Sequence, residues 1–236
     1  MKAVLFDLDG TLFDTAPDFI HVLNQLRQQE QLPPLPDAAI RAVVSNGARA
    51  MVELGFGIQE GDAQFESLRK RFLDLYLGHL AVKTQPFPGI EPLLGQLAAA
   101  DIAWGIVTNK PLVYTAPLLR AFPHLPAVGA VICPEHVVNR KPHPEPMLLA
   151  CAQIGCHPEE AIYVGDHPRD IDAGRAAGMP TIACNYGYID DGDDPAGWNA
   201  DHLVDSAEEI WPLLQQHYIE KTGLGTRDSG LGSPAL

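Results

Sequence analysis

Two aspartates, Asp7 and Asp9, follow directly after the apolar run at residues 4–6. Alternate side chains of an extended chain point to the same side, so both carboxylates are expected on one side of the strand end. Gly10 then permits a turn that most other residues would resist. Two neighbouring carboxylates are costly to hold together unless positive charge lies between them. This short segment therefore predicts a site for a cation or a basic side chain.

Further polar residues follow two later apolar runs. Thr108 and Asn109 come directly after residues 102–107, and Asp166 comes after residues 161–164. Ligands of open parallel sheets bind outside the carboxyl ends of the strands. If these runs are parallel strands, their polar tips meet the two N-terminal aspartates in one crevice.

The oxygen-rich composition of this crevice favours Mg²⁺, a hard cation that takes carboxylates, water and phosphate oxygens as ligands. Asp7 and Asp166 are the predicted carboxylate ligands, and the backbone carbonyl of Asp9 is the predicted third protein oxygen. Such a metal site is suited to phosphoryl chemistry, because the cation offsets the charge of the phosphate.

A phosphate group also needs donors from the protein. Lys141, in the segment NRKPHP, is predicted to neutralise the phosphoryl oxygens, and Thr108 and Asn109 are predicted to donate hydrogen bonds to them. Lys110 either assists at the phosphate or begins the next helix before Pro111, and the sequence leaves both open.

The elements that position these residues alternate between apolar runs and helical patterns. Strands are predicted at residues 2–6, 102–107, 130–133, 161–164, 181–184 and, from a weaker pattern, 203–204. Helices are predicted at residues 90–100, 112–121, 144–154, 169–177 and 207–217. The runs are almost continuously apolar, as expected for strands covered on both faces. The pattern predicts an α/β fold with a doubly wound, Rossmann-like parallel sheet.

The long segment between the first two predicted strands has helical periodicity instead. Its apolar residues form two stripes at helical spacing, which are Phe19, Val22, Leu23 and Leu26, and then Phe65, Leu68, Phe72 and Leu75. We interpret residues 16–84 as an inserted α-helical cap, because the segment is too long for a single crossover. The alternative is that these helices only cover one face of the sheet.

These patterns divide the chain into a core at residues 1–15 and 85–218, the cap, and a tail at residues 219–236. The tail is rich in glycine, serine and proline and has no periodicity, so we expect it to be disordered.

The spaced motifs as a set resemble a known family. DLDGT at residues 7–11, Thr108-Asn109, Lys141 and GDHPRD at residues 165–170 are similar to the four ordered motifs of the haloacid dehalogenase-like hydrolases. The resemblance covers residues 2–214. It implies a Mg²⁺-dependent phosphatase with a helical cap that works through an aspartyl-phosphate.

The resemblance also implies a role for each motif residue. Asp7 would be the nucleophile and Asp9 the general acid and base, while Thr108 and Lys141 would bind the phosphoryl group. Asp166 would be a Mg²⁺ ligand, with Asp170 acting on the metal only through another group or a water molecule. To act first as an acid, Asp9 must be protonated.

The segments DLDGTLFDTAPDF, VTNKP and KPHPEPMLLA look most like the phosphoglycolate phosphatase branch of that family. The segments SNGARAM and GWNAD are more similar to a related branch that acts on N-acetylmuramic acid 6-phosphate. The resemblance therefore implies one of two small phosphorylated metabolites as substrate, and both carry a carboxylate.

The cap is expected to decide between substrates. Gly47 lets the backbone turn toward the crevice, so Ser45, Asn46 and Arg49 are predicted to contact the substrate. Arg49 is suited to a bidentate grip on a carboxylate. The alternative is that Arg49 is a solvated helix charge and Asn46 a helix cap.

Three other functions share parts of this pattern. A sugar phosphomutase would use the same aspartyl-phosphate and return the phosphoryl group to another hydroxyl. A signalling domain would use Asp7 only as a phospho-acceptor, and a non-catalytic protein would bind its ligand without catalysing a reaction.

His167 is interpreted as a loop residue, because Mg²⁺ prefers oxygen ligands.

The composition of the chain disfavours some classes of binding partner. The formal net charge of −14 on 236 residues disfavours nucleic acid and anionic membranes. No apolar stretch approaches the roughly 20 residues of a membrane helix, and no secretory signal is recognisable, so we expect a cytoplasmic protein. The cysteines are expected to be reduced thiols. The protein is expected to be a monomer or homodimer.

Overall fold

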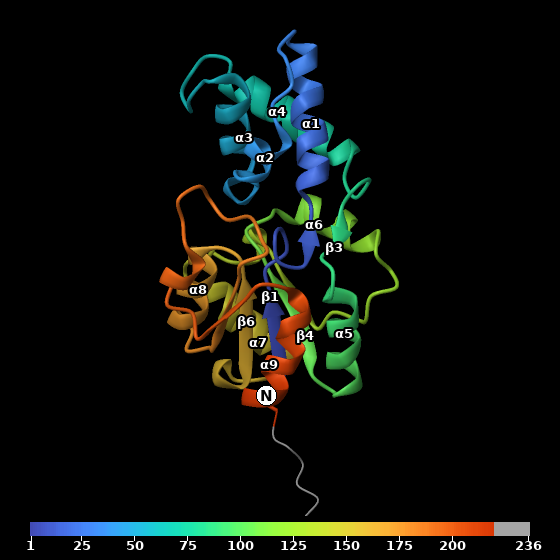
Figure 1. The fold of residues 1–236 in the computed structure, drawn as a ribbon, viewed down its shortest axis with the longest axis vertical. Coiled ribbons are helices and arrows are strands. Elements are labelled where there is room, and N and C mark those ends of the chain that lie inside the picture. Colours follow the sequence, from blue (N-terminus) through green and yellow to red (C-terminus); the bar gives the residue numbers. More distant parts are fainter. Residues whose placement is uncertain (220–236) are drawn as a thin grey trace, which may run out of the picture.

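The computed structural model describes residues 1–219 and has a parallel β-sheet at its centre (Figure 1). The sheet is six-stranded, in the order β5-β4-β1-β6-β7-β8, and every neighbouring pair is parallel. Its strands are β1 Ala3–Phe6, β4 Ala103–Val107, β5 Ala130–Ile132, β6 Ala161–Gly165, β7 Thr181–Cys184 and β8 His202–Val204. The predicted doubly wound parallel fold is confirmed.

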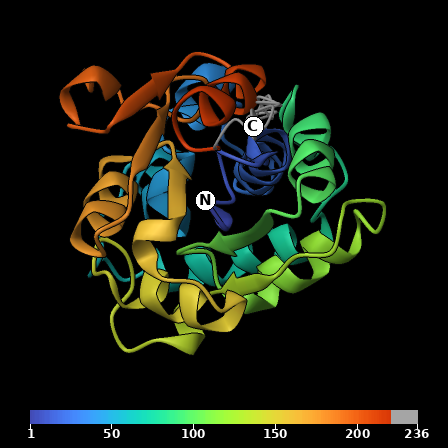
Figure 2. The same ribbon diagram turned by 90° about the horizontal axis from the view of Figure 1, so that it is seen from below.

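Helices cover both faces of the sheet, as the view along it in Figure 2 shows. The side chains of β1 alternate between the two faces, because successive residues of a strand point in opposite directions. Val4 and Phe6 join one apolar cluster and Leu5 joins the other. The first cluster includes α5 (Ile90–Ala99), α6 (Leu112–Arg120) and α9 (Ile210–His217). The second includes α7 (Glu145–Ile154) and α8 (Pro168–Ala176).

Between β1 and α5 the chain leaves the sheet and forms a separate group of helices, seen at the top of Figure 1. We call this group the cap. Its helices are α1 Ala16–Gln29, α2 Asp37–Arg41, α3 Gly47–Phe56 and α4 Phe65–Gly78, with a 3₁₀ turn at Val44–Asn46. α1 packs against α2, α3 and α4. The stacked rings of Phe19 and Tyr76, 4.1 Å apart, fix α1 on α4.

A short antiparallel ribbon marks the place where the chain enters and leaves the cap. It consists of β2 (Phe13–Asp14) and β3 (Gln85–Pro86). The sequence predicts no strand in this region, because a run of two residues is too short to show an alternating pattern. The ribbon holds the two connections side by side beneath the cap.

The remaining differences from the predicted elements are small. The helix predicted at residues 207–217 begins as a 3₁₀ turn before α9. Other 3₁₀ turns lie at Pro134–His136, Pro158–Glu160 and Pro195–Gly197. The predicted disordered tail lies outside the described residues, apart from Ile219.

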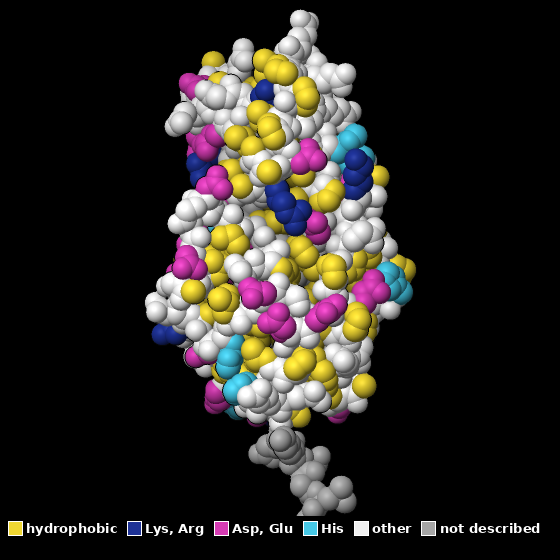
Figure 3. Space-filling model, viewed as in Figure 1, with side chains coloured by type: hydrophobic (Ala, Val, Ile, Leu, Met, Phe, Trp, Pro, Cys, Tyr) yellow, Lys and Arg dark blue, Asp and Glu magenta, His cyan; other side chains and the backbone are white. Residues whose placement is uncertain are grey.

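No helix among residues 1–219 is both long and apolar enough to span a membrane. The surface in Figure 3 carries acidic side chains spread over the core, in keeping with the net charge of −14.

Candidate active site

The carboxyl ends of β1, β4 and β6 bring the predicted motif residues into one crevice beneath the cap. At its floor, Lys141 reaches across from the loop before α7. Its Nζ lies 2.9 Å from Oδ1 of Asp7 and 2.7 Å from Oδ1 of Asp170. The ammonium also donates to the Tyr163 hydroxyl at 2.8 Å, and that hydroxyl donates to the Val107 carbonyl at 2.7 Å. The lysine is thus fixed from three sides within the crevice.

Burial and charge together set the ionisation of this group. Burial acts to raise the pKa of Asp7, but the charge and hydrogen bond of Lys141 and a hydrogen bond from the Leu8 backbone lower the pKa below its ordinary value. Burial acts to lower the pKa of Lys141, and the carboxylates of Asp170 and Asp7 outweigh it, so that this pKa is raised. Asp7 and Lys141 therefore form a charged pair at neutral pH.

Oxygen atoms of Asp7, Asp166 and Asp170 lie within 4.8 Å of one another. Three buried carboxylates face a single buried ammonium, Lys141, so the group keeps an excess of negative charge. Burial, and next the carboxylates of Asp7 and Asp170, raise the pKa of Asp166 well above its ordinary value. Burial, partly opposed by Lys141, raises the pKa of Asp170 to about 6. A hard divalent cation fits this oxygen donor set and would relieve the repulsion.

Asp166 is held in place by β6 and by two loops. Its Oδ1 accepts a hydrogen bond from the Thr11 hydroxyl at 2.8 Å, and its Oδ2 accepts one from the backbone N–H of Tyr188 at 2.8 Å. Gly10, with φ of +84°, and Gly187 pass so close that a Cβ at either position would overlap the Asp166 side chain. The turn is one reason for a glycine at position 10, and close packing on Asp166 is a second.

The side chain of Asp9 is turned toward the cap and away from the three clustered carboxylates. Its Oδ1 accepts a hydrogen bond from the Thr15 hydroxyl at 2.7 Å, and Lys110 Nζ lies 2.9 Å from the same oxygen. The role of the Asp9 backbone carbonyl at the metal stays a prediction.

Thr108 and Asn109 lie where β4 ends, as the sequence predicted. The Thr108 hydroxyl accepts from the backbone N–H of Lys110 at 3.1 Å, which tightens the turn. The carboxamide of Asn109 donates to the Lys141 carbonyl at 3.1 Å and so joins the second and third motifs.

A cavity of about 1010 Å³ lies between this floor and the cap. Most of the predicted site residues line it, namely Asp7, Asp9, Ser45, Asn46, Arg49, Thr108, Asn109 and Lys141. Asp166 and Asp170 lie behind them and are 1% and 0% exposed. The structure thus brings together residues that are far apart in the sequence.

The three cap residues predicted to contact the substrate, Ser45, Asn46 and Arg49, contact other residues of the protein. The Ser45 carbonyl accepts a hydrogen bond from the Arg169 guanidinium at 2.5 Å, and the Asn46 carboxamide donates to Asp190 at 3.0 Å. Both contacts join the cap to the core. Arg49 pairs with Glu53 at 3.0 Å, and its side chain is 57% exposed.

His167 begins α8, and its Nδ1 accepts from the backbone N–H of Arg169 at 3.2 Å. Burial, and then the nearby Arg169 charge, lower the pKa of His167 to about 4. The ring is therefore neutral at pH 7 and serves the loop, in line with its interpretation from the sequence.

Several residues at the site were not found from the sequence. Tyr163 sits within an apolar run, and Tyr76 within an ordinary apolar stripe, so neither pattern signalled a polar contact. Thr11 ends the first motif and Thr15 follows four residues after it. Hydroxyls so close in sequence to Asp7 and Asp9 gave a usable signal that was overlooked.

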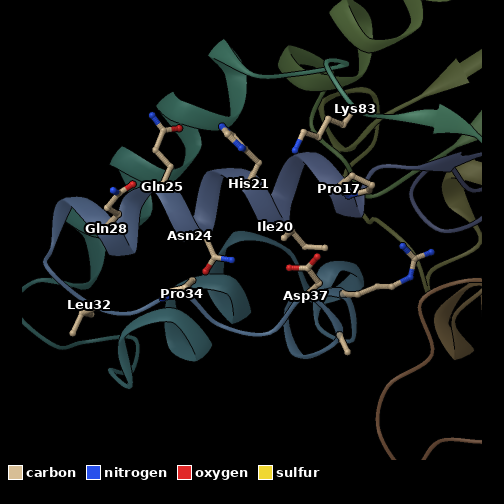
Figure 4. A pocket seen from close by; sticks show the side chains of 12 residues that line it. Pro17, Ile20, His21, Asn24, Gln25, Gln28, Leu32, Pro34, Asp37 and Lys83 are labelled. Atoms are coloured by element: carbon tan, nitrogen blue, oxygen red, sulfur yellow. The ribbon is translucent and has the colours of Figure 1, made fainter.

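A second cavity, of about 1100 Å³, lies on the cap between α1 and the segment that leads into α2 (Figure 4). His21, Asn24 and Gln25 of α1 line it, together with Asp37 and Lys83. None of the predicted site residues reaches it. The predicted catalytic residues therefore line the cavity at the strand ends and not this one.

A parallel sheet whose strand ends present clustered carboxylates, a buried lysine and a helical cap defines an enzyme of phosphoryl transfer. Comparison with known proteins agrees. Residues 4–184 match the family described as haloacid dehalogenase-like hydrolase, and the chain belongs to that family.

The chain is also similar to individual relatives. It is 45% identical over 216 residues to the N-acetylmuramic acid 6-phosphate phosphatase of Pseudomonas aeruginosa, which covers 92% of this chain and 96% of that protein. It is 43% identical over 216 residues to the phosphoglycolate phosphatase of Xanthomonas campestris, covering 89% and 95% of the two chains.

Among solved structures, a predicted phosphoglycolate phosphatase from Haemophilus somnus superposes with a TM-score of 0.79 at 26% identity, covering 91% of this chain and 98% of that one. The protein is a phosphoric monoester hydrolase. Mg²⁺ dependence and an aspartyl-phosphate intermediate are typical of its family.

Proposed function

We propose that the protein removes the phosphate from N-acetylmuramic acid 6-phosphate. The observation that carries this proposal is the 45% identity to the Pseudomonas aeruginosa phosphatase of that name over 92% of the chain. The cavity supports it, because about 1010 Å³ lies at the upper end of the roughly 300–1,000 Å³ of small-molecule sites. An acetylated amino sugar with a lactyl group uses such a space better than a two-carbon acid.

In the proposed reaction Asp7 attacks phosphorus, and the bond from phosphorus to the sugar oxygen breaks. Asp9 gives a proton to that oxygen, so that a neutral alcohol leaves. Water then attacks the aspartyl-phosphate while Asp9 takes its proton, which releases inorganic phosphate and restores Asp7. The lowered pKa of Asp7 supports its role as the nucleophile.

The other motif residues serve the phosphoryl group and the metal. Lys141 and Thr108 bind the phosphoryl oxygens in this proposal, and Asn109 fixes the Lys141 loop. Asp7, Asp166 and the Asp9 carbonyl would hold Mg²⁺, with Asp170 acting indirectly through Lys141. When bound, Mg²⁺ supplies positive charge that offsets the charge of the phosphoryl oxygens.

The cap residues Ser45, Asn46 and Arg49 remain the predicted contacts for the sugar. Their place on the cavity wall supports this role. A cytoplasmic location, a monomeric or homodimeric state and the absence of nucleic acid or membrane partners also remain predictions.

Phosphoglycolate phosphatase activity is the second candidate, on the strength of the 43% identity to the Xanthomonas campestris protein. Steady-state phosphate release with Mg²⁺ separates the two. We expect kcat/KM for N-acetylmuramic acid 6-phosphate to exceed that for 2-phosphoglycolate and for N-acetylglucosamine 6-phosphate, which lacks the lactyl carboxylate. A higher kcat/KM for 2-phosphoglycolate would reverse the assignment.

A further inference from the structure

The ammonium of Lys110 is enclosed between the catalytic floor and the cap, although no motif assigns it a role. Its Nζ lies 2.9 Å and 3.1 Å from the two carboxylate oxygens of Asp9. It also donates to the hydroxyl of Tyr76, in α4 of the cap, at 2.8 Å. The Lys110 side chain is only 4% exposed.

Two aromatic rings of the cap complete the enclosure. Lys110 Nζ lies 4.9 Å from the centroid of the Phe19 ring and 4.8 Å from that of Tyr76. Stacked rings at this distance attract a cation through their negative faces. Burial, and next the carboxylates of Asp9 and Asp18, raise the pKa of Tyr76 well above its ordinary value. The Tyr76 hydroxyl therefore stays neutral.

Stability alone does not explain this arrangement. The free energy needed to remove an ammonium from water is about as large as the attraction gained in a buried ion pair. An apolar side chain of similar length is therefore often as stabilising. The ammonium of Lys110 instead contacts one carboxyl group, that of Asp9, the proposed general acid and base. Thr15 holds the same carboxylate at 2.7 Å, so its orientation is set by two donors.

We propose that Lys110 is a positioning residue through which the cap orients Asp9 in the crevice. Phe19 and Tyr76 hold the ammonium, and the ammonium holds the carboxylate. Asp9 is then aligned for proton transfer when the cap lies over the crevice and water is excluded from it. This inference rests on the proposed role of Asp9 and is independent of which sugar or acid is the substrate.

A double-mutant cycle tests the proposal. We expect Lys110→Met to lower kcat about 10- to 100-fold on a sugar 6-phosphate, because a misaligned acid forfeits part of the roughly 10²–10⁴-fold that proton transfer contributes. In an Asp9→Asn background the same change should alter kcat by no more than about twofold. Lys110→Arg, which keeps the charge, should recover part of the loss.

A substrate with a different leaving group provides a second test. p-Nitrophenolate leaves without a proton, so Lys110→Met should cost less kcat on p-nitrophenyl phosphate than on the sugar phosphate. From the cap side, Tyr76→Phe should lower kcat about 3- to 10-fold with little change in KM. Tyr218→Phe removes a hydroxyl that bonds only to His202 among the described contacts and serves as the matched control.

The outcomes distinguish two kinds of failure. Equal losses from Lys110→Met in both backgrounds, or equal losses on both substrates, would overturn the positioning role and leave the proposed function standing. Full activity of Asp9→Asn on the sugar phosphate would reject the assigned acid and the inference with it.

Discussion

The ammonium of Lys141 lies 2.9 Å from Oδ1 of Asp7, and both groups are buried at the strand ends. This pairing keeps the proposed nucleophile charged, since the pKa of Asp7 is lowered against the effect of burial. A phosphoryl group in the cavity above would meet a carboxylate and a cation side by side. The pair therefore supplies both the attacking carboxylate and a cation that offsets the charge of the phosphoryl group.

Asp7→Asn is expected to abolish turnover while preserving the fold. The carboxamide has the same shape but cannot form the aspartyl-phosphate, so kcat should fall by at least about 10³-fold. Phosphate release and circular dichroism check the two parts of the prediction. Asp172→Asn, an exposed aspartate on α8, is the matched control and should keep full activity. Substantial turnover by Asp7→Asn would require another nucleophile.

The crowded carboxylates make stability depend on pH and on Mg²⁺. The pKa values of Asp166 and Asp170 are raised above the ordinary 3.8, that of Asp170 to about 6. Between these values the folded protein binds more protons than the unfolded chain, so stability falls as pH rises. Without metal, Tm is expected to drop from about pH 4 to about pH 6 because of Asp170, and Asp166 extends the drop to higher pH. Asp7, with its lowered pKa, changes stability only at lower pH.

Magnesium should reverse this loss. It binds the ionised carboxylates of the folded state, so the rise in Tm on adding MgCl₂ should be larger at about pH 8 than at about pH 5. Thermal scans with and without the metal measure it. The rise should largely vanish in Asp166→Asn. A larger rise at about pH 5 than at about pH 8 would contradict the assigned ligands.

The strands and core helices could be predicted from the sequence because each forms a continuous apolar run or stripe. The motif residues could be placed because parallel strands end at one edge, and Asp7 and Asp166 indeed lie together there. The contacts of Lys110 with Tyr76 could not be predicted. They depend on how the cap sits on the core, and no periodicity within either element encodes that placement.

The predicted carboxylate contact of Arg49 leads to a split between substrates. Arg49→Ala should raise KM for N-acetylmuramic acid 6-phosphate about tenfold or more, because a charge-assisted hydrogen bond contributes roughly 1.5–3 kcal/mol. KM for p-nitrophenyl phosphate, which has no carboxylate, should change little. Lys70→Ala removes an exposed charge that is likewise paired four residues on, with Asp74, away from the cavity. It should leave both KM values unchanged.

Equal effects of Arg49→Ala on both substrates would discard this contact. The structure supplies a reason to consider that outcome, since Arg49 is mostly exposed and already paired with Glu53. Arg169 also lines the cavity and donates to the Ser45 carbonyl. Arg169→Lys would then be the variant to compare on the same two substrates.

The packing of Gly187 against Asp166 gives a prediction that joins stability to metal binding. A Cβ at Gly187 would overlap the Asp166 side chain, which is 1% exposed. Gly187→Ala should therefore destabilise the protein by about 1–3 kcal/mol in urea unfolding. It should also weaken Mg²⁺ binding, because Asp166 must shift from its hydrogen bonds to Thr11 and Tyr188. Gly95→Ala, in α5 with open space around its Cβ, should instead be neutral or stabilising by up to about 1 kcal/mol. Unchanged Mg²⁺ affinity in a destabilised Gly187→Ala would show that Asp166 keeps its position while the surrounding backbone moves.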